Sequence, residues 1–322
     1  MVIMVTGGAG FIGGNFLHYL HNYCSNEIKQ IVCVDKLTYA SNYAYIKPLV
    51  DNGFVTFIKH DIENHLMVNA LKDYDITHIV NFAAETHVDQ SIDNPFKFLL
   101  TNEFGTFKLL DFARTLPNLK KFIHVSTDEV YGSLSKWEWP FTEESPYQPN
   151  SPYSASKASS DHWVRAFHKT YNLPTIVTNC SNNYGPNQHN EKFIPKVIEN
   201  ALNDKPIPVY GDGTNIRDWL YVDDHCRALY LVLTKGVAGE KYNIGGGIEI
   251  SNKEIVRIIL NMLGKPESLL EYVKDRPGHD FRYSINYEKI KQELGYQPMM
   301  GLTEGLKRTI EWSKNGNKTS KT

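Results

Sequence analysis

Two pairs of side chains have the types and spacing that acid–base catalysis uses. Tyr153 and Lys157 are four residues apart, and Pro152 predicts that a helix begins just before them. On a helix, that spacing places the phenol and the ammonium on one face. The ammonium favours the phenolate, so we expect it to lower the pKa of Tyr153 toward the working pH. A pair on the solvent-exposed face of a helix is the plainer alternative.

The second pair is Asp128 and Glu129, which together with Thr127 follow the apolar, strand-like run Lys121–Ser126. Adjacent carboxylates at a strand end are usually solvated turn residues. In a closed site they would instead repel each other, so the pKa of one would rise and the pair would divide into a proton donor and a proton acceptor. A simple oxidoreductase or epimerase needs only the Tyr–Lys unit, whereas a dehydratase needs an acid and a base in addition.

A glycine-rich segment predicts a dinucleotide site near these groups. Gly7, Gly10 and Gly13 lie directly between the apolar run Val2–Thr6 and the helical pattern Phe11–Tyr23. Glycines allow a tight turn and a close backbone approach, and a helix N-terminus attracts a pyrophosphate. A tight turn that binds nothing is the alternative.

Asp35 bears on which dinucleotide would bind. It ends the second apolar run, where a carboxylate can accept hydrogen bonds from both ribose hydroxyls and would repel a 2′-phosphate. This favours NAD over NADP, with the charge of the neighbouring Lys36 acting in the opposite direction. Two further segments would lie along the cofactor. One follows the apolar run Phe54–Ile58 and contains Asp61 and Ile62, and the other ends the run His78–Ala83 and contains Phe82, Ala83 and Ala84.

A sheet must position these residues. Apolar runs alternate with helical patterns, and the runs are Val2–Thr6, Ile31–Asp35, Phe54–Ile58, His78–Ala83, Lys121–Ser126 and Pro174–Asn179. This alternation predicts an α/β fold with a doubly wound parallel (Rossmann) sheet. Beyond it, turns, helices and short strands predict a smaller mixed α/β substrate lobe. We therefore expect an NAD-binding Rossmann domain over 1–178 and mainly a substrate lobe over 179–322, with some segments returning to the first domain.

Composition excludes several classes of partner. The 322 residues carry 34 Lys+Arg against 36 Asp+Glu, a net charge of −2, which argues against nucleic acid and anionic membranes. We expect neither a membrane span nor a signal peptide. The four cysteines and twelve histidines show no metal-ligand spacing, so we predict no metal site and a reducing, cytoplasmic location.

Seven segments together carry a family resemblance: Gly7–Gly13, Ala83–Asp89, Ser126–Gly132, Tyr153–Lys157, Asn179–Pro186, Arg217–His225 and Asp275–Asp280. Over nearly the whole chain they resemble the extended short-chain dehydrogenase/reductases, and within that group the dTDP-glucose 4,6-dehydratases. The Asp-Glu pair and the last segment are the most specific. The sequence departs from the family pattern at Gln90, where we expect arginine, and at Gly14, where we expect serine.

The resemblance implies dehydration of dTDP-glucose to dTDP-4-keto-6-deoxyglucose. The sugar would be oxidised transiently at C4 by bound NAD, lose water across C5 and C6, and take the hydride back at C6. Tyr153, ionised by Lys157, would remove the proton of the 4-hydroxyl, and Thr127 would hydrogen-bond the C4 oxygen. Glu129 would take the C5 proton that the new ketone acidifies, and Asp128 would protonate the leaving 6-hydroxyl.

The motifs and the resemblance together assign two sets of contacts. NAD would contact Gly7, Gly10, Phe11, Ile12, Gly13, Asp35, Lys36, Leu37, Thr38, Asp61, Ile62, Phe82, Ala83, Ala84, Thr101, Tyr153, Lys157 and Asn183. The sugar nucleotide would contact Thr86, Thr127, Asn182, Lys192, Phe193, Pro208, Val209, Tyr210, Arg217, Asn252, Asp275, Arg276 and His279. Family members are typically homodimers joined through long helices, here expected at Phe96–Thr115 and Tyr153–Tyr171.

Three other functions remain open from the sequence. UDP-glucose differs from dTDP-glucose in its base by one methyl group, which is worth only about 1–3 kcal/mol in an apolar pocket. A 4-epimerase would not need both Asp128 and Glu129. A non-catalytic NAD-binding regulator would have a broken Tyr–Lys unit, and here that unit is intact.

Overall fold

A seven-stranded parallel sheet forms the larger part of the molecule. The computed structural model describes residues 1–64, 70, 71 and 73–319, with side chains as far as 315. In spatial order the strands are β10 (Lys241–Ile244), β6 (Thr175–Cys180), β5 (Lys121–Thr127), β4 (His78–Asn81), β1 (Val2–Thr6), β2 (Gln30–Asp35) and β3 (Val55–Lys59). Every neighbouring pair is parallel. The predicted doubly wound sheet is confirmed, and the ends of its six predicted strands shift by two residues at most.

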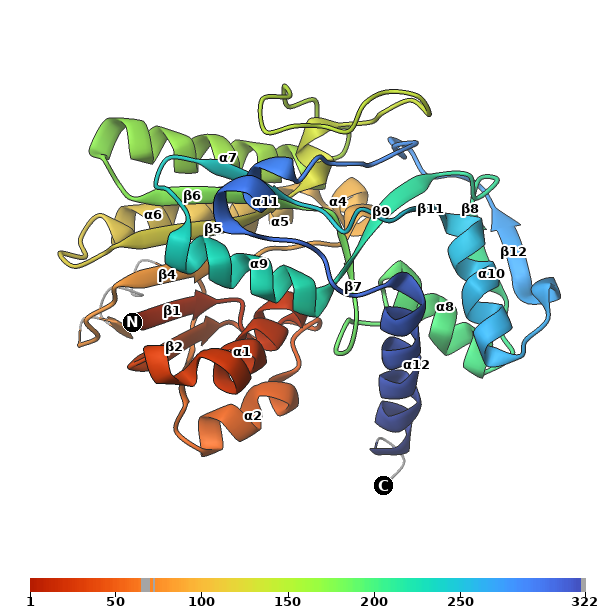
Figure 1. Ribbon diagram of the computed structural model, residues 1–322, viewed down its shortest axis with the longest axis horizontal. Helices are drawn as coiled ribbons and strands as arrows, with labels where there is room; N and C mark the ends of the chain where they lie inside the picture. The colour runs from red at the N-terminus through yellow and green to blue at the C-terminus, as the bar shows by residue number, and fades with distance from the viewer. Residues whose placement is uncertain (65–69, 72, 320–322) are drawn as a thin grey trace.

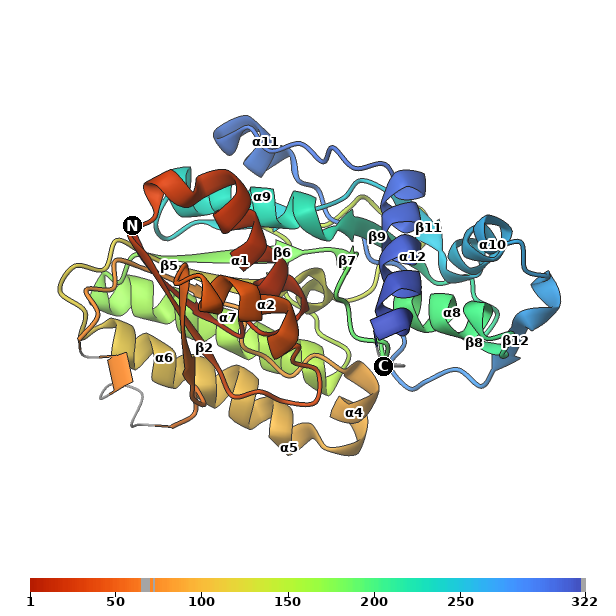
Figure 2. The same cartoon turned by 90° about the horizontal axis from the view of Figure 1, so that it is seen from below.

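Helices cover both faces of this sheet (Figures 1 and 2). On one side lie α1 (Phe11–Cys24), α2 (Tyr43–Asp51), α9 (Val222–Lys235) and α11 (Glu288–Leu294). On the other lie α5 (Pro95–Phe98), a π-helical segment (Leu99–Gly105), α6 (Thr106–Ala113) and α7 (Pro152–Tyr171). A short helix, α4 (Val88–Asp93), contacts α5 and α7.

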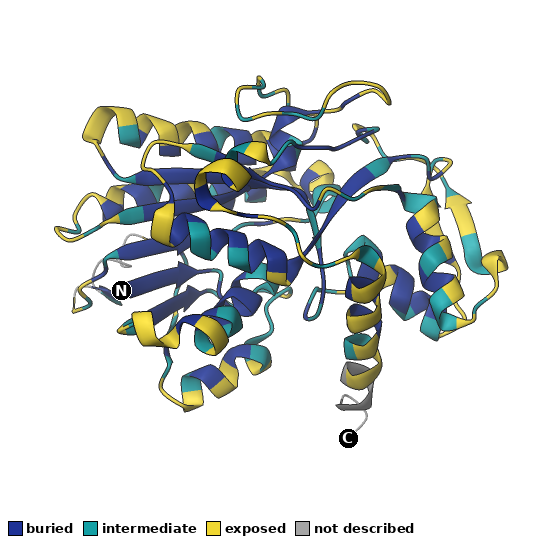
Figure 3. Cartoon of the chain, viewed as in Figure 1, coloured by how far each residue is buried: buried dark blue, intermediate teal, exposed yellow. Residues whose placement is uncertain are grey.

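Strand β1 shows why these strands are apolar throughout. Its side chains alternate between the two faces, so Ile3 and Val5 pack under α1 and α9 while Met4 packs under α6 and α7. Figure 3 shows the resulting buried interior. The order of the strands reverses between β1 and β4, and a ligand site is expected in the crevice outside their carboxyl ends.

A smaller lobe lies beyond those ends (Figure 1, right). It contains a three-stranded mixed sheet, a pair of parallel strands and three helices with their own apolar core. The strands are β7 (Asn182–Tyr184), β9 (Ile216–Tyr221), β11 (Glu249–Ser251), β8 (Ile207–Tyr210) and β12 (Leu270–Val273). The helices are α8 (Phe193–Leu202), α10 (Asn252–Leu263) and α12 (Leu302–Thr319). Short 3₁₀ turns occur at Ser25–Glu27, Asp128–Tyr131 and Glu267–Leu269.

The second half of the chain also contributes to the large sheet. β10 pairs with β6 as the seventh strand, and α9 and α11 pack on one face of the sheet. The strand alternation in the first half of the sequence did not predict this strand. Among the described residues, no helix combines the length and the apolar character that crossing a bilayer requires.

Candidate active site

A cavity of about 700 Å³ lies between the carboxyl ends of the sheet and the smaller lobe. It brings together 29 of the predicted site residues. They are Gly7, Gly10, Phe11, Ile12, Gly13, Asp35, Lys36, Thr38, Asp61, Ile62, Phe82, Ala83, Ala84, Thr86, Thr101, Thr127, Glu129, Tyr153, Lys157, Asn182, Asn183, Lys192, Phe193, Pro208, Tyr210, Arg217, Asn252, Arg276 and His279.

Four predicted residues do not form its wall, namely Leu37, Asp128, Val209 and Asp275. In β8, side chains alternate, so Pro208 and Tyr210 line the cavity while Val209 points into the core of the smaller lobe. Asp275 instead holds His279, with its Oδ1 2.6 Å from the ring Nδ1.

The glycine segment forms a narrow cradle between β1 and α1. At Gly7, where φ is +69°, an added Cβ would lie 2.7 Å from the backbone nitrogen of Ala83. At Gly13 it would lie 2.4 Å from the carbonyl oxygen of Gly7. Gly10 is the N-cap of the 14-residue helix α1 and has no side chain to cap it, and the start of this helix, Phe11 to Gly13, lines the cavity. An uncapped helix start beside a cradle of glycines fits the pyrophosphate of a dinucleotide.

Replacing Gly13 with alanine tests this cradle. The new methyl group would collide with backbone atoms, so we expect the loop to shift. Inserting a methyl group into a tightly packed site typically costs about 1–3 kcal/mol, so we expect NAD to bind at least ~10-fold more weakly. Titration calorimetry with NAD measures the effect. Gly301→Ala is the matched control, because a Cβ there would meet nothing. Unchanged NAD affinity in Gly13→Ala would show that the cradle does not hold the cofactor.

Asp35 and Lys36 form the adjoining part of the wall. The Asp35 carboxylate accepts hydrogen bonds from the backbone nitrogens of Ala9 (3.0 Å) and Leu37 (2.8 Å), which fixes its direction and leaves acceptor capacity for ribose hydroxyls. The Lys36 ammonium lies 3.4 Å from Asp61 and 3.1 Å from Glu63. Its charge is thus already paired, and this removes the objection that it would attract a 2′-phosphate.

Tyr153 and Lys157 lie in the first two turns of α7, as predicted. Ser151 caps this helix through a hydrogen bond from the backbone nitrogen of Ser154. Lys157 is only 3% exposed, and its Nζ donates to the carbonyl oxygen of Val125 at 2.9 Å. Burial lowers the pKa of Lys157 to about 8, while the buried carboxylate of Asp161 opposes this shift.

The predicted effect of Lys157 on Tyr153 is wrong in this structure. Burial raises the pKa of Tyr153 well above its ordinary value, the carboxylate of Glu129 raises it further, and a hydrogen bond with Thr127 lowers it. The Lys157 ammonium is held by the Val125 carbonyl and lies 3.4 Å from His124 Nε2. Desolvation therefore outweighs the charge of the lysine.

Asp128 and Glu129 occupy different environments although they are adjacent. Glu129 lines the cavity, and burial raises its pKa while Arg276, Arg217 and Lys192 oppose the rise. Asp128 is 1% exposed and lies behind the wall, where burial and the charge of Glu129 raise its pKa well above the ordinary value. Asp128 is thus the carboxyl more favoured as a proton donor, and Glu129 is the one more favoured as a proton acceptor. This is the division of roles that we predicted.

Cations from the smaller lobe reach the same cavity. Lys192 Nζ donates to the carbonyl oxygen of Thr86 at 2.5 Å, and Arg276 forms an ion pair with Asp89 at 3.1 Å. Arg217 lies over the ring of Tyr283, 4.2 Å from its centroid, and donates to backbone carbonyls. Three positive groups on one wall provide the charge that a diphosphate needs.

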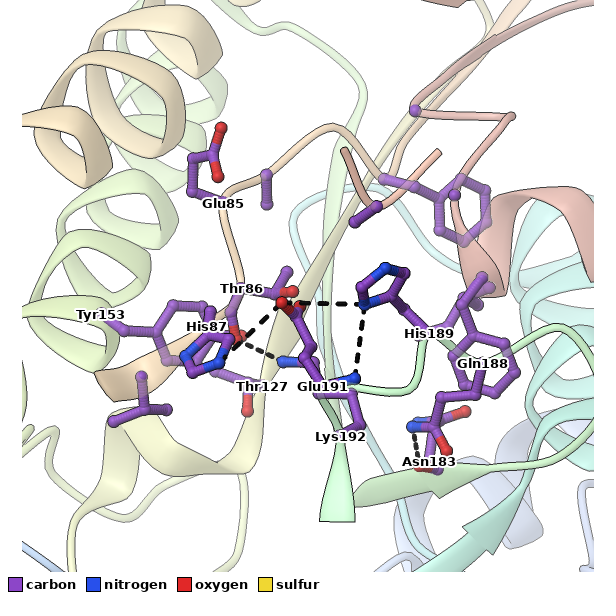
Figure 4. A pocket seen from close by; sticks show the side chains of 18 of the residues that line it. Glu85, Thr86, His87, Thr127, Tyr153, Asn183, Gln188, His189, Glu191 and Lys192 are labelled. Carbon is purple, nitrogen blue, oxygen red and sulfur yellow. Dashed lines mark hydrogen bonds and ion pairs between the residues drawn. The ribbon is translucent and has the colours of Figure 1, made fainter. Parts of the chain in front are cut away.

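Sequence reasoning missed a cluster around Glu191 (Figure 4). Its carboxylate lies 3.8 Å from His87 Nε2 and 3.8 Å from His189 Nδ1, and all three residues line the cavity. The ring of Tyr39 meets His189 edge-on. His87 directly follows the predicted Thr86, and Glu191 directly precedes the predicted Lys192. Their position next to predicted site residues could have indicated that they also line the cavity.

The chain is similar to known sugar-nucleotide dehydratases over nearly its whole length. The family model described as GDP-mannose 4,6 dehydratase matches residues 4–309. A dTDP-glucose 4,6-dehydratase from Haemophilus influenzae is 48% identical over 97% of this chain and 97% of its own, and one from Xanthomonas campestris is 50% identical over 96% and 92%.

Solved structures show the same likeness. A dTDP-glucose 4,6-dehydratase from Streptomyces venezuelae, with NAD and TYD bound, has a TM-score of 0.95 at 45% identity and covers 99% of this chain and 98% of its own. A UDP-glucuronic acid 4-epimerase from Bacillus cereus, with UDP-glucuronic acid and NAD, has a TM-score of 0.91 at 30% identity, covering 98% and 99%. With its glycine cradle, its Tyr–Lys pair and its two carboxyls, the chain belongs to the dTDP-glucose 4,6-dehydratases of the extended short-chain dehydrogenase/reductase family.

Proposed function

We propose that this protein dehydrates dTDP-glucose to dTDP-4-keto-6-deoxyglucose and depends on NAD. The observation that carries this proposal is the pair Asp128 and Glu129 beside Tyr153, with the partly buried Glu129 on the cavity wall and the buried Asp128 directly behind it. An epimerase needs only the Tyr–Lys unit, and elimination of water needs both an acid and a base.

The first chemical task is removal of the proton of the sugar 4-hydroxyl. NAD, when bound, accepts the hydride from C4 and returns it to C6. Tyr153 takes the hydroxyl proton, and Lys157, one helical turn further along α7, is held in place by the Val125 carbonyl. Thr127 holds the C4 oxygen with its hydroxyl.

The second task is elimination of water. A ketone at C4 acidifies the C5 proton, and Glu129 on the cavity wall takes it. Asp128 is the proton donor for the leaving 6-hydroxyl, because burial raises its pKa and so favours the protonated form, and its Oδ2 has no hydrogen-bond partner among the described residues. Glu129 then returns a proton to C5.

We further propose that each lobe holds one ligand. Residues 1–178 hold mainly NAD, through the glycine cradle and Asp35. Residues 179–322 hold mainly the sugar nucleotide, with the diphosphate on Lys192, Arg217 and Arg276.

Incubation with dTDP-glucose and, separately, with UDP-glucose tests the function. We expect a 4-keto-6-deoxy product from dTDP-glucose, detected by its carbonyl and by the loss of 18 mass units that water represents. The same product formed preferentially from UDP-glucose would reassign the base. A 4-epimer with no loss of mass would replace the dehydratase with an epimerase.

We propose that the protein is a homodimer and works in the cytoplasm. All four cysteines are free thiols, which suits a reducing compartment. The π-helical segment carries the exposed apolar side chains of Leu99 and Phe104, and the neighbouring α7 carries that of Trp163. Side chains of this kind on adjacent helices are typical of an interface between identical subunits.

A charge in this surface should separate the subunits. Phe104→Asp is expected to convert the dimer to a monomer, because a carboxylate would be buried without a partner. Light scattering after size-exclusion chromatography measures the mass. Tyr23→Asp, at an exposed aromatic residue on α1, is the control and should leave the dimer intact. A wild-type mass equal to that of one chain would contradict the proposal.

A further inference from the structure

One carboxylate from the sheet side of the cavity holds two side chains of the smaller lobe. Asp89 lies in the first turn of α4 and lines the cavity. Its Oδ1 forms the ion pair with Arg276 Nη1 at 3.1 Å, and its Oδ2 accepts a hydrogen bond from the Tyr210 hydroxyl at 3.0 Å. Arg276 and Tyr210 also line the cavity, and both are predicted contacts of the sugar nucleotide.

The position of this carboxylate requires a reason, because a negative charge at the wall of a diphosphate site repels the ligand. Burial raises the pKa of Asp89, but Arg276 and Tyr210 together hold the pKa below its ordinary value. The side chain is therefore ionised, and its charge is offset by the guanidinium that it contacts. What it contributes to the cavity is the placement of that guanidinium.

The ion pair leaves most of the Arg276 guanidinium available to a ligand. Among the described residues, the one hydrogen bond of this side chain runs from Nη1 to Asp89, and the buried Nε has no partner. Nε and Nη2 are parallel donors on the other edge of the fork, a geometry that can bind two phosphate oxygens together. A buried donor without a partner costs free energy, and a phosphate oxygen would supply that partner.

The chain just before Asp89 also contacts the smaller lobe (Figure 4). The carbonyl oxygen of Thr86 accepts a hydrogen bond from Lys192 Nζ at 2.5 Å, and His87 Nε2 lies 3.8 Å from the Glu191 carboxylate. This short segment therefore contacts two of the three cations to which we assign the diphosphate.

We propose that Asp89 is a positioning residue, which aligns Arg276 and Tyr210 before the nucleotide diphosphate arrives. The inference rests on the proposed function, because the diphosphate is that of the proposed substrate. A long side chain loses rotamer freedom when a ligand fixes it, and a side chain that is already fixed avoids this cost on binding. Loss of the Asp89 carboxylate should therefore weaken nucleotide binding and leave the reacting groups in place.

Titration calorimetry with dTDP tests this role. Asp89→Asn removes the charge and keeps the shape, and we expect it to weaken dTDP binding at least ~5-fold. In an Arg276→Met background the same substitution should change the affinity by less than ~2-fold, because the side chain that it positions is gone. Glu267→Gln breaks an exposed ion pair with Arg257 in the same lobe, so it is the matched control and should leave dTDP affinity unchanged.

Steady-state kinetics separate positioning from a general loss of structure. With dTDP-glucose, Asp89→Asn should raise KM as it weakens dTDP binding, while kcat stays within ~2-fold of wild type. Asp89→Ser replaces Asp89→Asn if the latter does not fold. Unchanged or tighter dTDP binding by the variant, or an equal loss in the Arg276→Met background, would overturn the positioning role. Failure of wild type to bind dTDP would overturn the proposed function itself, which distinguishes the two failures.

Discussion

Tyr153→Phe is expected to lower the turnover of dTDP-glucose by ~100-fold or more, the share of the rate that a positioned proton acceptor supplies. The substitution removes the one oxygen and leaves the ring, which packs edge-on against Phe98. The initial rate of 4-keto product measures the loss, and NAD affinity should change little because the backbone cradle is untouched.

Tyr184→Phe is the matched control for this variant. Tyr184 is fully buried in the smaller lobe, and its hydroxyl has no hydrogen-bond partner among the described residues. Its loss should leave turnover unchanged. Turnover by Tyr153→Phe close to that of wild type would remove the phenol from the mechanism.

Glu129→Gln is expected to stop the reaction after oxidation at C4. The amide keeps the shape of the carboxyl but cannot accept the C5 proton, so elimination of water should slow by ~100-fold or more. Oxidation at C4 does not require this group. Reduced nicotinamide should therefore accumulate and be visible by its absorbance, with 4-keto-glucose nucleotide in the quenched mixture and no loss of water.

Glu143→Gln provides the comparison. Burial raises the pKa of Glu143 as well, but this residue lies outside the cavity wall, where its Oε1 accepts a hydrogen bond from the Asn243 backbone at 2.8 Å. The Glu143→Gln variant should dehydrate the sugar at the wild-type rate. If Glu129→Gln also lost water normally, another group would have to be the base.

The parts of the site that follow from local sequence were predictable. The turn between β1 and α1 depends on Gly7, Gly10 and Gly13 in one short segment, and the Tyr–Lys pair depends on helical spacing alone. The carboxyl ends of the strands in a parallel sheet meet at one edge. Because Thr127 and Asp35 each end or follow an apolar, strand-like segment, the sequence could place both near the cofactor.

The remaining features depend on contacts between distant segments. The pKa of Tyr153 is set chiefly by how deeply the folded protein buries the phenol, and residue spacing in the sequence does not reveal that depth. The cluster of Glu191 with His87 and His189 joins residues about a hundred positions apart. Val209 was assigned to the ligand because a family segment was carried over whole, whereas the alternation of β8 turns it to the core.

The seventh strand has a consequence for how such proteins can be divided and recombined. β10 arrives from beyond residue 178, and Asn243 within it binds the hydroxyl of Tyr131 at 2.8 Å. A gene fragment ending at 178 would cut β6 short and leave what remains of its outer edge without a neighbour, which invites aggregation. The two parts of the chain therefore form a single folding unit, and a chimaera joined at 178 would have to rebuild the β6–β10 pairing.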